Sequence, residues 1–170
     1  GIGAVAAGAG LDVDEVFSTY LYEGTSASLT INNGIDLATE DGLTWIKCRN
    51  AAEDHFLFSS LQNGSGQTLF LKSNTSGAAV ATNGVSQTAT GFTVPVDGMV
   101  NQTGNDYASW TFRKAPKWFD IVTYTGTGVN RTISHDLGST PGMIIVKRTD
   151  STGDWACYHR GLNGGTNPAT

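Results

Sequence analysis

The sequence is poor in charge and has no long hydrophobic run. Only 15% of its 170 residues are Asp, Glu, Lys or Arg, and the net charge is −5. Nucleic-acid backbones and anionic membranes both attract clustered Lys and Arg, which this acidic chain lacks. No segment approaches the roughly 20 apolar residues that a membrane-spanning helix needs. The composition therefore predicts neither a nucleic-acid partner nor insertion into a membrane.

Cysteine is scarce as well, since Cys48 and Cys157 are the only two. They lie near equivalent strands of an internal repeat that is described below. If each lies inside its own folded unit, the two are too far apart to bridge. We therefore expect two free thiols that pack as small apolar groups, with a disulfide as the alternative.

The usual spacings of catalytic and zinc-binding residues are also missing. Ser134, His135 and Asp136 contain the three residue types of a hydrolase triad, but neighbours in sequence cannot face one another in triad geometry. The other histidines, His55 and His159, do not stand at zinc-binding spacings, although a long-range cluster is not ruled out by sequence. We predict no catalytic, cofactor-binding or metal-ligating residue, and we expect a protein that is not an enzyme.

Acidic residues in turns leave one alternative open, because their carboxylates are the oxygen ligands that calcium prefers. None of them follows an EF-hand loop or a nonapeptide loop. Calcium binding therefore remains an alternative and not a prediction. The residues concerned are Asp36, Glu40, Asp41, Asp97 and Asp106.

What the sequence does contain is an internal repeat. Phe119–Leu162 is a second, divergent version of Phe17–Leu61, with Lys147 matching Lys47. A repeat of this length predicts an array of similar β-modules. Nothing in the second copy corresponds to the first copy from Gln62 onward, so we expect the sequence to be part of a longer natural chain.

Short β-type runs alternate with turns rich in Gly and Asn. In Leu43–Arg49 we expect Ile46 and Cys48 on the dry face of a strand and Trp45 on a half-exposed face. Many short strands with few helix signals predict an all-β fold of β-sandwich or jelly-roll-like modules in tandem. The expected strands are Tyr20–Tyr22, Ser28–Ile31, Leu43–Arg49, His55–Ser59, Thr68–Lys72, Phe92–Pro95 and Ala108–Lys114.

We divide the chain into an N-terminal arm (1–16), a first β-sandwich module (17–115) and the start of a second, related β-module (116–170). Acidic residues at its start favour one helical turn within Asp12–Thr19. Lys114–Trp118, which contains a proline, is expected to be a short, stiff linker. The extended arm has too little bulk to fold alone, and we expect it to anchor the chain on a partner. Its anchoring residues would be Ile2, Val5, Leu11, Val13, Val16 and Phe17.

Aromatic side chains are the remaining candidates for a binding site. Exposed rings stack on sugars, so Trp45, Trp155 and Tyr158 are candidate contacts for a glycan or another partner. The tryptophans fall within predicted strands beside apolar neighbours, and several aromatic positions recur in both copies. This pattern favours packing over ligand stacking. A shallow groove beside an exposed Trp45 or Trp155 would favour the glycan alternative.

Four strings occur in order along the chain: WIK-x-R, NDY-x-SW-x-F-x-KAP, FD-x-V-x-Y-x-G and LG-x-x-PGMIIVK. They resemble the repeated modules of tail-fibre and other virion-surface structural proteins of tailed bacteriophages, notably marine, cyanophage-like ones. The resemblance covers almost all of Phe17–Leu162. It implies a non-enzymatic structural component of the virion, first of all a tail fibre, or its virion-proximal N-terminal part, involved in host attachment. The alternatives are a capsid decoration or surface protein and a glycan-binding, lectin-like module.

The same resemblance implies where the protein lies and what it contacts. It implies a place on the phage tail or capsid surface, with other tail or capsid proteins as partners. It also implies a homo-oligomer such as a trimer, although no coiled-coil heptad sets that number. A host surface glycan is a further candidate partner.

Overall fold

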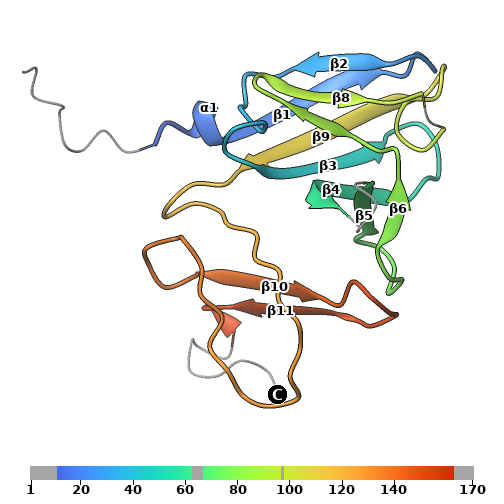
Figure 1. The fold of residues 1–170 in the computed structure, drawn as a ribbon. Helices are drawn as coiled ribbons and strands as arrows, with labels where there is room; N and C mark the ends of the chain where they lie inside the picture. The colour runs from blue at the N-terminus through green and yellow to red at the C-terminus, as the bar shows by residue number, and fades with distance from the viewer. Residues whose placement is uncertain (1–10, 63–66, 97, 163–170) are drawn as a thin grey trace, which may run out of the picture.

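The computed structural model describes residues 11–62, 67–96 and 98–162, so Ile2, Val5 and Asp97 lie outside the described residues. The described part is almost entirely β, in three antiparallel sheets (Figure 1). None of its helices has the length and apolarity to cross a bilayer. The elements are α1 (Val13–Val16), β1 (Phe17–Glu23), β2 (Leu29–Asn32), β3 (Gly42–Cys48), β4 (His55–Gln62), β5 (Thr68–Lys72), β6 (Val80–Thr82), β7 (Ser86–Thr88), β8 (Gly91–Val94), β9 (Asp106–Arg113), β10 (Met143–Lys147) and β11 (Trp155–His159).

Two of the sheets form a sandwich. The larger has the strand order β1-β9-β3-β4-β5-β6, and the smaller, β2-β8-β7, covers one of its faces (Figure 1). Removal of apolar side chains from water drives this packing. The prediction of an all-β, sandwich-like fold is confirmed. The buried cluster joins Ile31, Phe92 and Val94 of the smaller sheet to Tyr22, Ile46, Cys48, Phe56, Phe58, Phe70 and Tyr107 of the larger, with Ile35, Leu37, Val85 and Val100 from the connections.

Strand β3 shows why the sequence pattern was informative. Its residues alternate between buried and half-buried, with Ile46 and Cys48 facing the core and Trp45 on the outer face. Alternate side chains of a strand point to opposite faces, so a strand covered on one face reads as a two-residue pattern. The prediction for these three residues is confirmed. Cys157 is exposed, however, and so only Cys48 packs as a small apolar group; both thiols are free.

Strands β6 and β7, which carry the chain from one sheet to the other, were not predicted from the sequence. Strand β6 pairs with β5 at the edge of the larger sheet, and β7 pairs with β8 in the smaller one. Val85, between them, is only 3% exposed and anchors the crossing in the core. Strands of three residues are too short to show a recognisable period, which explains why they were missed.

The second copy of the repeat forms a hairpin instead of a second sandwich. Strands β10 and β11 pair in register from Met143↔His159 to Lys147↔Trp155, and they correspond to β3 and β4. No strand lies within 120–142, so the strands expected there from the repeat are not formed. The reason is that β1 pairs with β9 and β2 with β8, and the described part of the second copy has no counterpart of either partner. Tyr124 is accordingly 50% exposed, whereas its counterpart Tyr22 is buried.

The join between the copies is a tight turn. An isolated bridge between Ala115 and Phe119 closes the turn. The Trp118 ring packs edge-on against Phe17 at 6.3 Å, and Phe119 packs against Phe112 at 5.5 Å. These rings cover one end of the outer face of the larger sheet, so the join is itself packed on the sandwich.

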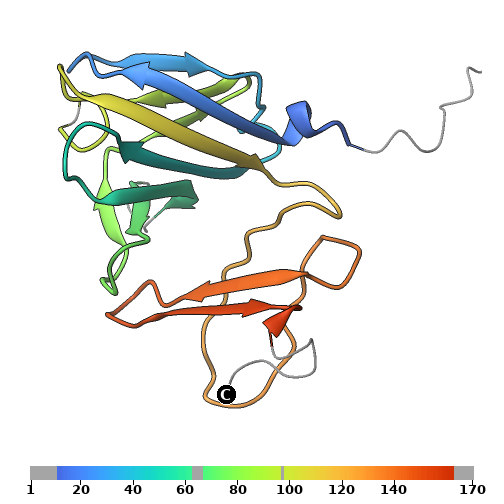
Figure 2. The ribbon, with the colours of Figure 1, turned by 180° about the vertical axis from the view of Figure 1, so that it is seen from behind.

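The far end of the hairpin is also held by the sandwich. The turn between β10 and β11 lies beside the β5–β6 connection (Figures 1 and 2). The Ala79 amide donates to the Thr149 carbonyl, and the Gly153 amide donates to the Ser76 carbonyl, both at 2.9 Å. The chain is therefore fixed at two separate places after β9.

The residues before β1 require one correction to the predicted arm. The helical turn is present as α1, where the Asp12 side chain caps the Asp14 amide at 3.4 Å. Val16 is only 2% exposed, and the Phe17 ring lies 5.0 Å from that of Phe112. Val16 and Phe17 are thus part of the sandwich and not of a free anchoring surface. Of the described arm residues, Leu11 and Val13 are exposed.

Candidate functional site

The outer face of the larger sheet carries a cluster of aromatic side chains. Trp45 and Trp110 stand directly opposite on β3 and β9, with their ring centroids 5.7 Å apart and their planes inclined by 64°. The Trp45 indole N–H donates to His55 Nδ1 at 3.0 Å. Since aromatic rings prefer such edge-to-face contacts in packing, the tryptophans support each other and do not form a flat platform for a sugar ring.

His55 is neutral in this arrangement, because its Nδ1 accepts a hydrogen bond. Burial lowers its pKa first, the positive charge of Lys47 lowers it further, and the carboxylate of Asp54 opposes both. A neutral imidazole completes the bond from Trp45. We therefore interpret the cluster of Trp45, Trp110 and His55 as packing on the sheet face.

The other two predicted glycan contacts lie on the hairpin. The Trp155 indole N–H donates to the Thr75 carbonyl at 2.9 Å, and Lys147 Nζ lies 6.0 Å from the Trp155 ring centroid. Trp155 thus holds the hairpin against the β5–β6 connection. Tyr158 stands three positions further along the strand and points to the opposite face. Trp45, Trp155 and Tyr158 are not brought together into one site.

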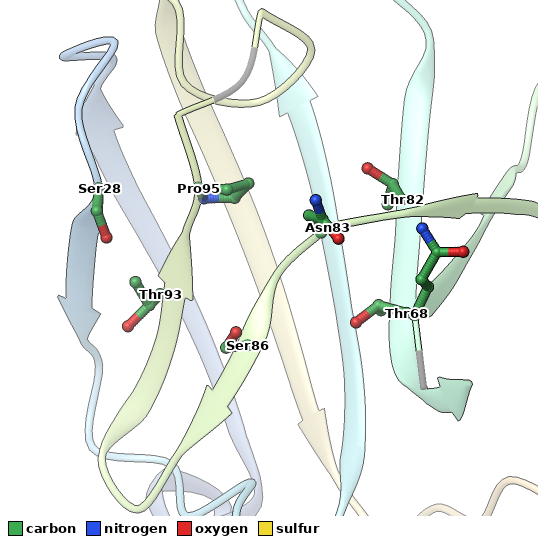
Figure 3. Close-up of a pocket in the computed structure, with 9 residues that line it drawn as sticks. Ser28, Thr68, Thr82, Asn83, Ser86, Thr93 and Pro95 are labelled. Atoms are coloured by element: carbon green, nitrogen blue, oxygen red, sulfur yellow. The ribbon is translucent and has the colours of Figure 1, made fainter. Parts of the chain in front are cut away.

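The structure contains a hollow that sequence reasoning missed. This polar hollow, of about 390 Å³, lies where the chain passes from β6 to β7 (Figure 3). Side chains from four strands of the two sheets line it, together with residues before β2, after β6 and after β8. The lining residues are Ser28, Gln67, Thr68, Thr82, Asn83, Gly84, Ser86, Thr93 and Pro95.

The chemistry of the polar hollow is that of neutral hydrogen-bonding groups. Among the described residues, its lining holds hydroxyl and carboxamide side chains but no carboxylate, ammonium, imidazole or thiol. One hydroxyl is already engaged, because the Thr93 and Thr30 hydroxyl oxygens lie 3.0 Å apart. Such a lining can donate to and accept from a neutral polar ligand, but it offers no general acid or base. Ser, Thr and Asn are so frequent in this chain that the residues of the hollow do not stand out in the sequence.

A second hollow lies beside α1 and is acidic. It has a volume of about 360 Å³ and is lined by Asp12, Asp14, Glu15, Gly34, Asp36 and Arg113. The Arg113 guanidinium also approaches Glu40, at 3.9 Å. No tryptophan lines either hollow, so the groove that would favour a glycan contact at Trp45 or Trp155 is in neither of them.

The acidic turn residues act within the fold. The Asp36 carboxylate accepts from the Thr39 amide at 3.0 Å. Asp41 accepts from the Gly42 amide and, at 2.7 Å, from the Ser60 hydroxyl. Among the residues that the structure describes, no three His, Cys, Asp or Glu side chains gather as a set of metal ligands.

A family model for a domain of unknown function (DUF7483) matches residues 12–169. The single match extends over both the sandwich and the β10–β11 hairpin. No curated protein and no solved structure matches the chain.

Proposed function

Since the chain belongs to the DUF7483 family, whose name assigns no activity, we propose a function from its sequence and structure: a non-enzymatic structural component of a tailed-bacteriophage virion. Within that class we propose a tail fibre that takes part in host attachment. The resemblance of the four sequence strings to virion-surface modules supports the class. The polar hollow, with its neutral lining, supports a binding or structural role over a catalytic one.

The observation that carries the proposal is the way in which the repeated hairpin is attached to the sandwich. The join before it packs on the sandwich through Phe119 and Phe112, and the hydrogen bonds of Ala79 and Gly153 hold the turn of the hairpin. Two separate attachments restrict both bending and rotation of one unit against the other. An appendage built of units in series needs such stiffness to hold its distal part away from the particle.

The experiment is to locate the protein on purified phage particles that encode it. Fab fragments raised against residues 17–115 are imaged on the particles by cryo-electron microscopy. The fibre proposal expects Fabs along tail appendages. Fabs spread over the capsid shell would overturn it in favour of a capsid decoration protein. Absence of the chain from particles by mass spectrometry would overturn both.

Attachment through the N-terminal arm can be tested with the two exposed residues Leu11 and Val13. Changing both to Ser removes apolar surface without touching the core, so the soluble protein should keep its unfolding temperature. We propose that incorporation into particles then falls, because the arm loses its apolar contact with a tail or capsid protein. Exposed Thr19, changed to Ala on β1, is the matched control. Unchanged incorporation of the double variant would contradict an anchoring role.

We also propose that the chain is a homo-oligomer, a trimer in the first place. Sedimentation equilibrium of the purified chain measures its mass directly. A mass three times that of the 17.8 kDa chain is expected. A monomer at all accessible concentrations would contradict it.

The polar hollow favours a second function, the binding of a neutral host glycan. Hydroxyl and carboxamide groups are the partners that sugar hydroxyls require. The chain would be screened on a glycan array. Its hits would be repeated with Asn83→Ala, which removes a carboxamide from the lining, and with Thr19→Ala on β1, at the far edge of the larger sheet. Weaker binding of Asn83→Ala alone would support the site, whereas no hit or equal binding by both variants would refute it.

A further inference from the structure

One edge of β10 is unpaired among the described residues, whereas the same edge of β3, its counterpart in the first copy of the repeat, is paired. In the sandwich, β3 lies between β4 and β9, whereas among the described residues β10 pairs with β11 alone. Unpaired strand edges present rows of N–H and C=O groups to other chains. The repeat therefore shows which kind of strand this edge is built to receive.

The hydrogen-bonding groups on that edge follow from the hairpin register. The Arg160 amide donates to the Gly142 carbonyl at 2.9 Å, so these two residues form a hydrogen-bonded pair. Such pairs alternate along an antiparallel ladder. The backbone groups of Ile144 and Val146 consequently face β11. Those of Met143, Ile145 and Lys147 face the free edge.

In β3 the backbone groups that face β9 lie at the equivalent positions. The Arg49 amide donates to the Asp106 carbonyl at 2.7 Å, and the Lys114 amide donates to the Asp41 carbonyl at 3.0 Å. By alternation, the backbone of Trp45 faces β9, opposite Trp110. The free backbone groups of β10 are therefore the counterparts of the groups that bind β9 in the first copy.

Both faces of β10 are apolar and exposed. The exposed fractions are 53% for Met143, 43% for Ile144, 55% for Ile145 and 38% for Val146. Two-stranded hairpins are marginally stable without a covered face, and contiguous exposed apolar surface marks interaction sites. By contrast Ile46, the counterpart of Val146, is fully buried in the sandwich.

The one charged side chain of β10 is held at the end of the strand. Lys147 Nζ donates to the Arg148 carbonyl at 2.7 Å and to the Ser76 carbonyl at 3.2 Å. Lysines on edge strands commonly protect the edge against pairing. Here the ammonium group is engaged with the β5–β6 connection, so the middle of the edge, around Ile145, has no charge on it.

We propose that the free edge of β10 accepts an antiparallel strand of the β9 type that lies outside residues 1–170. This strand addition would place a Trp opposite Ile145 and a Phe opposite Met143, as Trp110 and Phe112 stand opposite Trp45 and Leu43. The strand β9 of the same chain is already paired on both sides, with β1 and β3. No other stretch of residues 1–170 has its Tyr-x-Ser-Trp-x-Phe pattern, so the added strand has to come from outside these residues.

The test uses the full chain and a synthetic peptide that copies residues 105–114, NDYASWTFRK. In β9 the Gly24 amide donates to the Asn105 carbonyl, so by alternation the Ser109 N–H faces β1 and the Trp110 N–H faces β3. A peptide methylated on the backbone nitrogen of Trp110 loses the hydrogen bond to β10. One methylated on the Ser109 nitrogen keeps it and is the matched control.

The unmodified and Ser109-methylated peptides are expected to bind and to slow hydrogen exchange at the Met143, Ile145 and Lys147 amides, measured by NMR. Methylation at Trp110 should weaken binding about tenfold or more, since it removes a backbone bond and adds bulk at the interface. The protein variant Ile145→Lys, which puts a charge on the edge, should also weaken binding.

Three results of the peptide experiments would overturn the proposal. They are failure of the unmodified peptide to bind, equal weakening by the two methylated peptides, and protection mapped to another strand. Sedimentation of the chain alone tests a different occupant. Self-association that Ile145→Lys abolishes would identify a second copy of β10 as the partner in place of a β9-type strand.

Discussion

The Asp120 carboxylate offers a direct test of how the second copy is attached to the sandwich. Its Oδ1 accepts from the Ile121 amide at 2.8 Å and from Lys114 Nζ at 3.0 Å, and its Oδ2 accepts from the Asp136 amide at 2.8 Å. The side chain is only 6% exposed. It therefore ties the end of β9 to a residue 16 positions further on in the strandless region.

The perturbation is Asp120→Asn, which keeps the shape but replaces one oxygen with an NH₂ group. Whichever way the amide is turned, that NH₂ meets at least one backbone N–H that has lost its acceptor. Bonds to charged groups contribute about 1.5–3 kcal/mol, and an unsatisfied donor costs about 1–3 kcal/mol. Since Asp136 is exposed and water can replace the carboxylate there, we expect about 1–2 kcal/mol, or a factor of about 5–30 in local opening.

The assay is native-state hydrogen exchange at the Lys117 amide, which donates to the Leu137 carbonyl at 2.8 Å. In Asp120→Asn this amide should exchange faster, while the Arg49 amide in the sandwich should not change. Asp136→Asn is the matched control, because it removes a neighbouring negative charge but keeps the backbone N–H that Asp120 binds. Unchanged exchange at Lys117, or an equal effect of Asp136→Asn, would refute the reasoning.

The pH dependence follows from the pKa of Asp120, which lies below its ordinary value. Burial of the carboxylate raises its pKa, but the Asp136 amide, the Lys114 ammonium and the Ile121 amide together lower the pKa by more than burial raises it. The stabilisation from a lowered pKa is fully present above the ordinary carboxyl value of about 4 and is lost as pH falls through the lowered value. The difference in exchange between wild type and Asp120→Asn should therefore shrink below about pH 4.

Three further predictions concern single side chains. In the described structure the Thr44 hydroxyl is buried without a hydrogen-bond partner, so Thr44→Val should raise the free energy of unfolding in urea by about 1 kcal/mol; a loss would contradict this. Trp155→Phe keeps an aromatic ring but removes the bond to the Thr75 carbonyl, so β11 amides should exchange faster with no change in the melting temperature of the sandwich. The Lys72 hydrogen bond is the main cause that lowers the pKa of Asp54, so the stability difference between wild type and Asp54→Asn should be present at neutral pH and disappear below about pH 4.

The alternation of residue types predicted the strands that are covered on one face. Ile46 and Cys48 face the core and Trp45 faces outward, because a period of two is a local property that needs no knowledge of the partner strand. The polar hollow could not be predicted in this way. Its lining comes from several strands and connections far apart in sequence, and each contributes only a common Ser, Thr, Asn or Gln.

The arm and the aromatic candidates show a second limit of sequence reasoning. Val16 and Leu11 look alike in sequence as apolar residues near the start, yet one is buried under the sandwich and the other is exposed. The sequence left open whether Trp155 contacts a ligand or packs within the fold. Its hydrogen-bond acceptor, the Thr75 carbonyl, lies 80 positions away and could not be identified from the sequence. In both cases the deciding contact is long-range.

The two copies of the repeat separate local from long-range determinants of strand formation within one molecule. The pair β3–β4 is a hairpin whose strands are close in sequence, and its counterpart β10–β11 forms although nothing in the described structure corresponds to β9 beside it. Strand β1, by contrast, pairs only with β9, and its counterpart at 119–125 forms no strand. A short loop makes the entropic cost of closing a hairpin small, whereas a strand paired across most of a module has to be stabilised by the completed sheet. The residue pattern of 119–125 therefore indicates a capacity to form a strand, and the availability of a β9-type partner decides whether that strand forms.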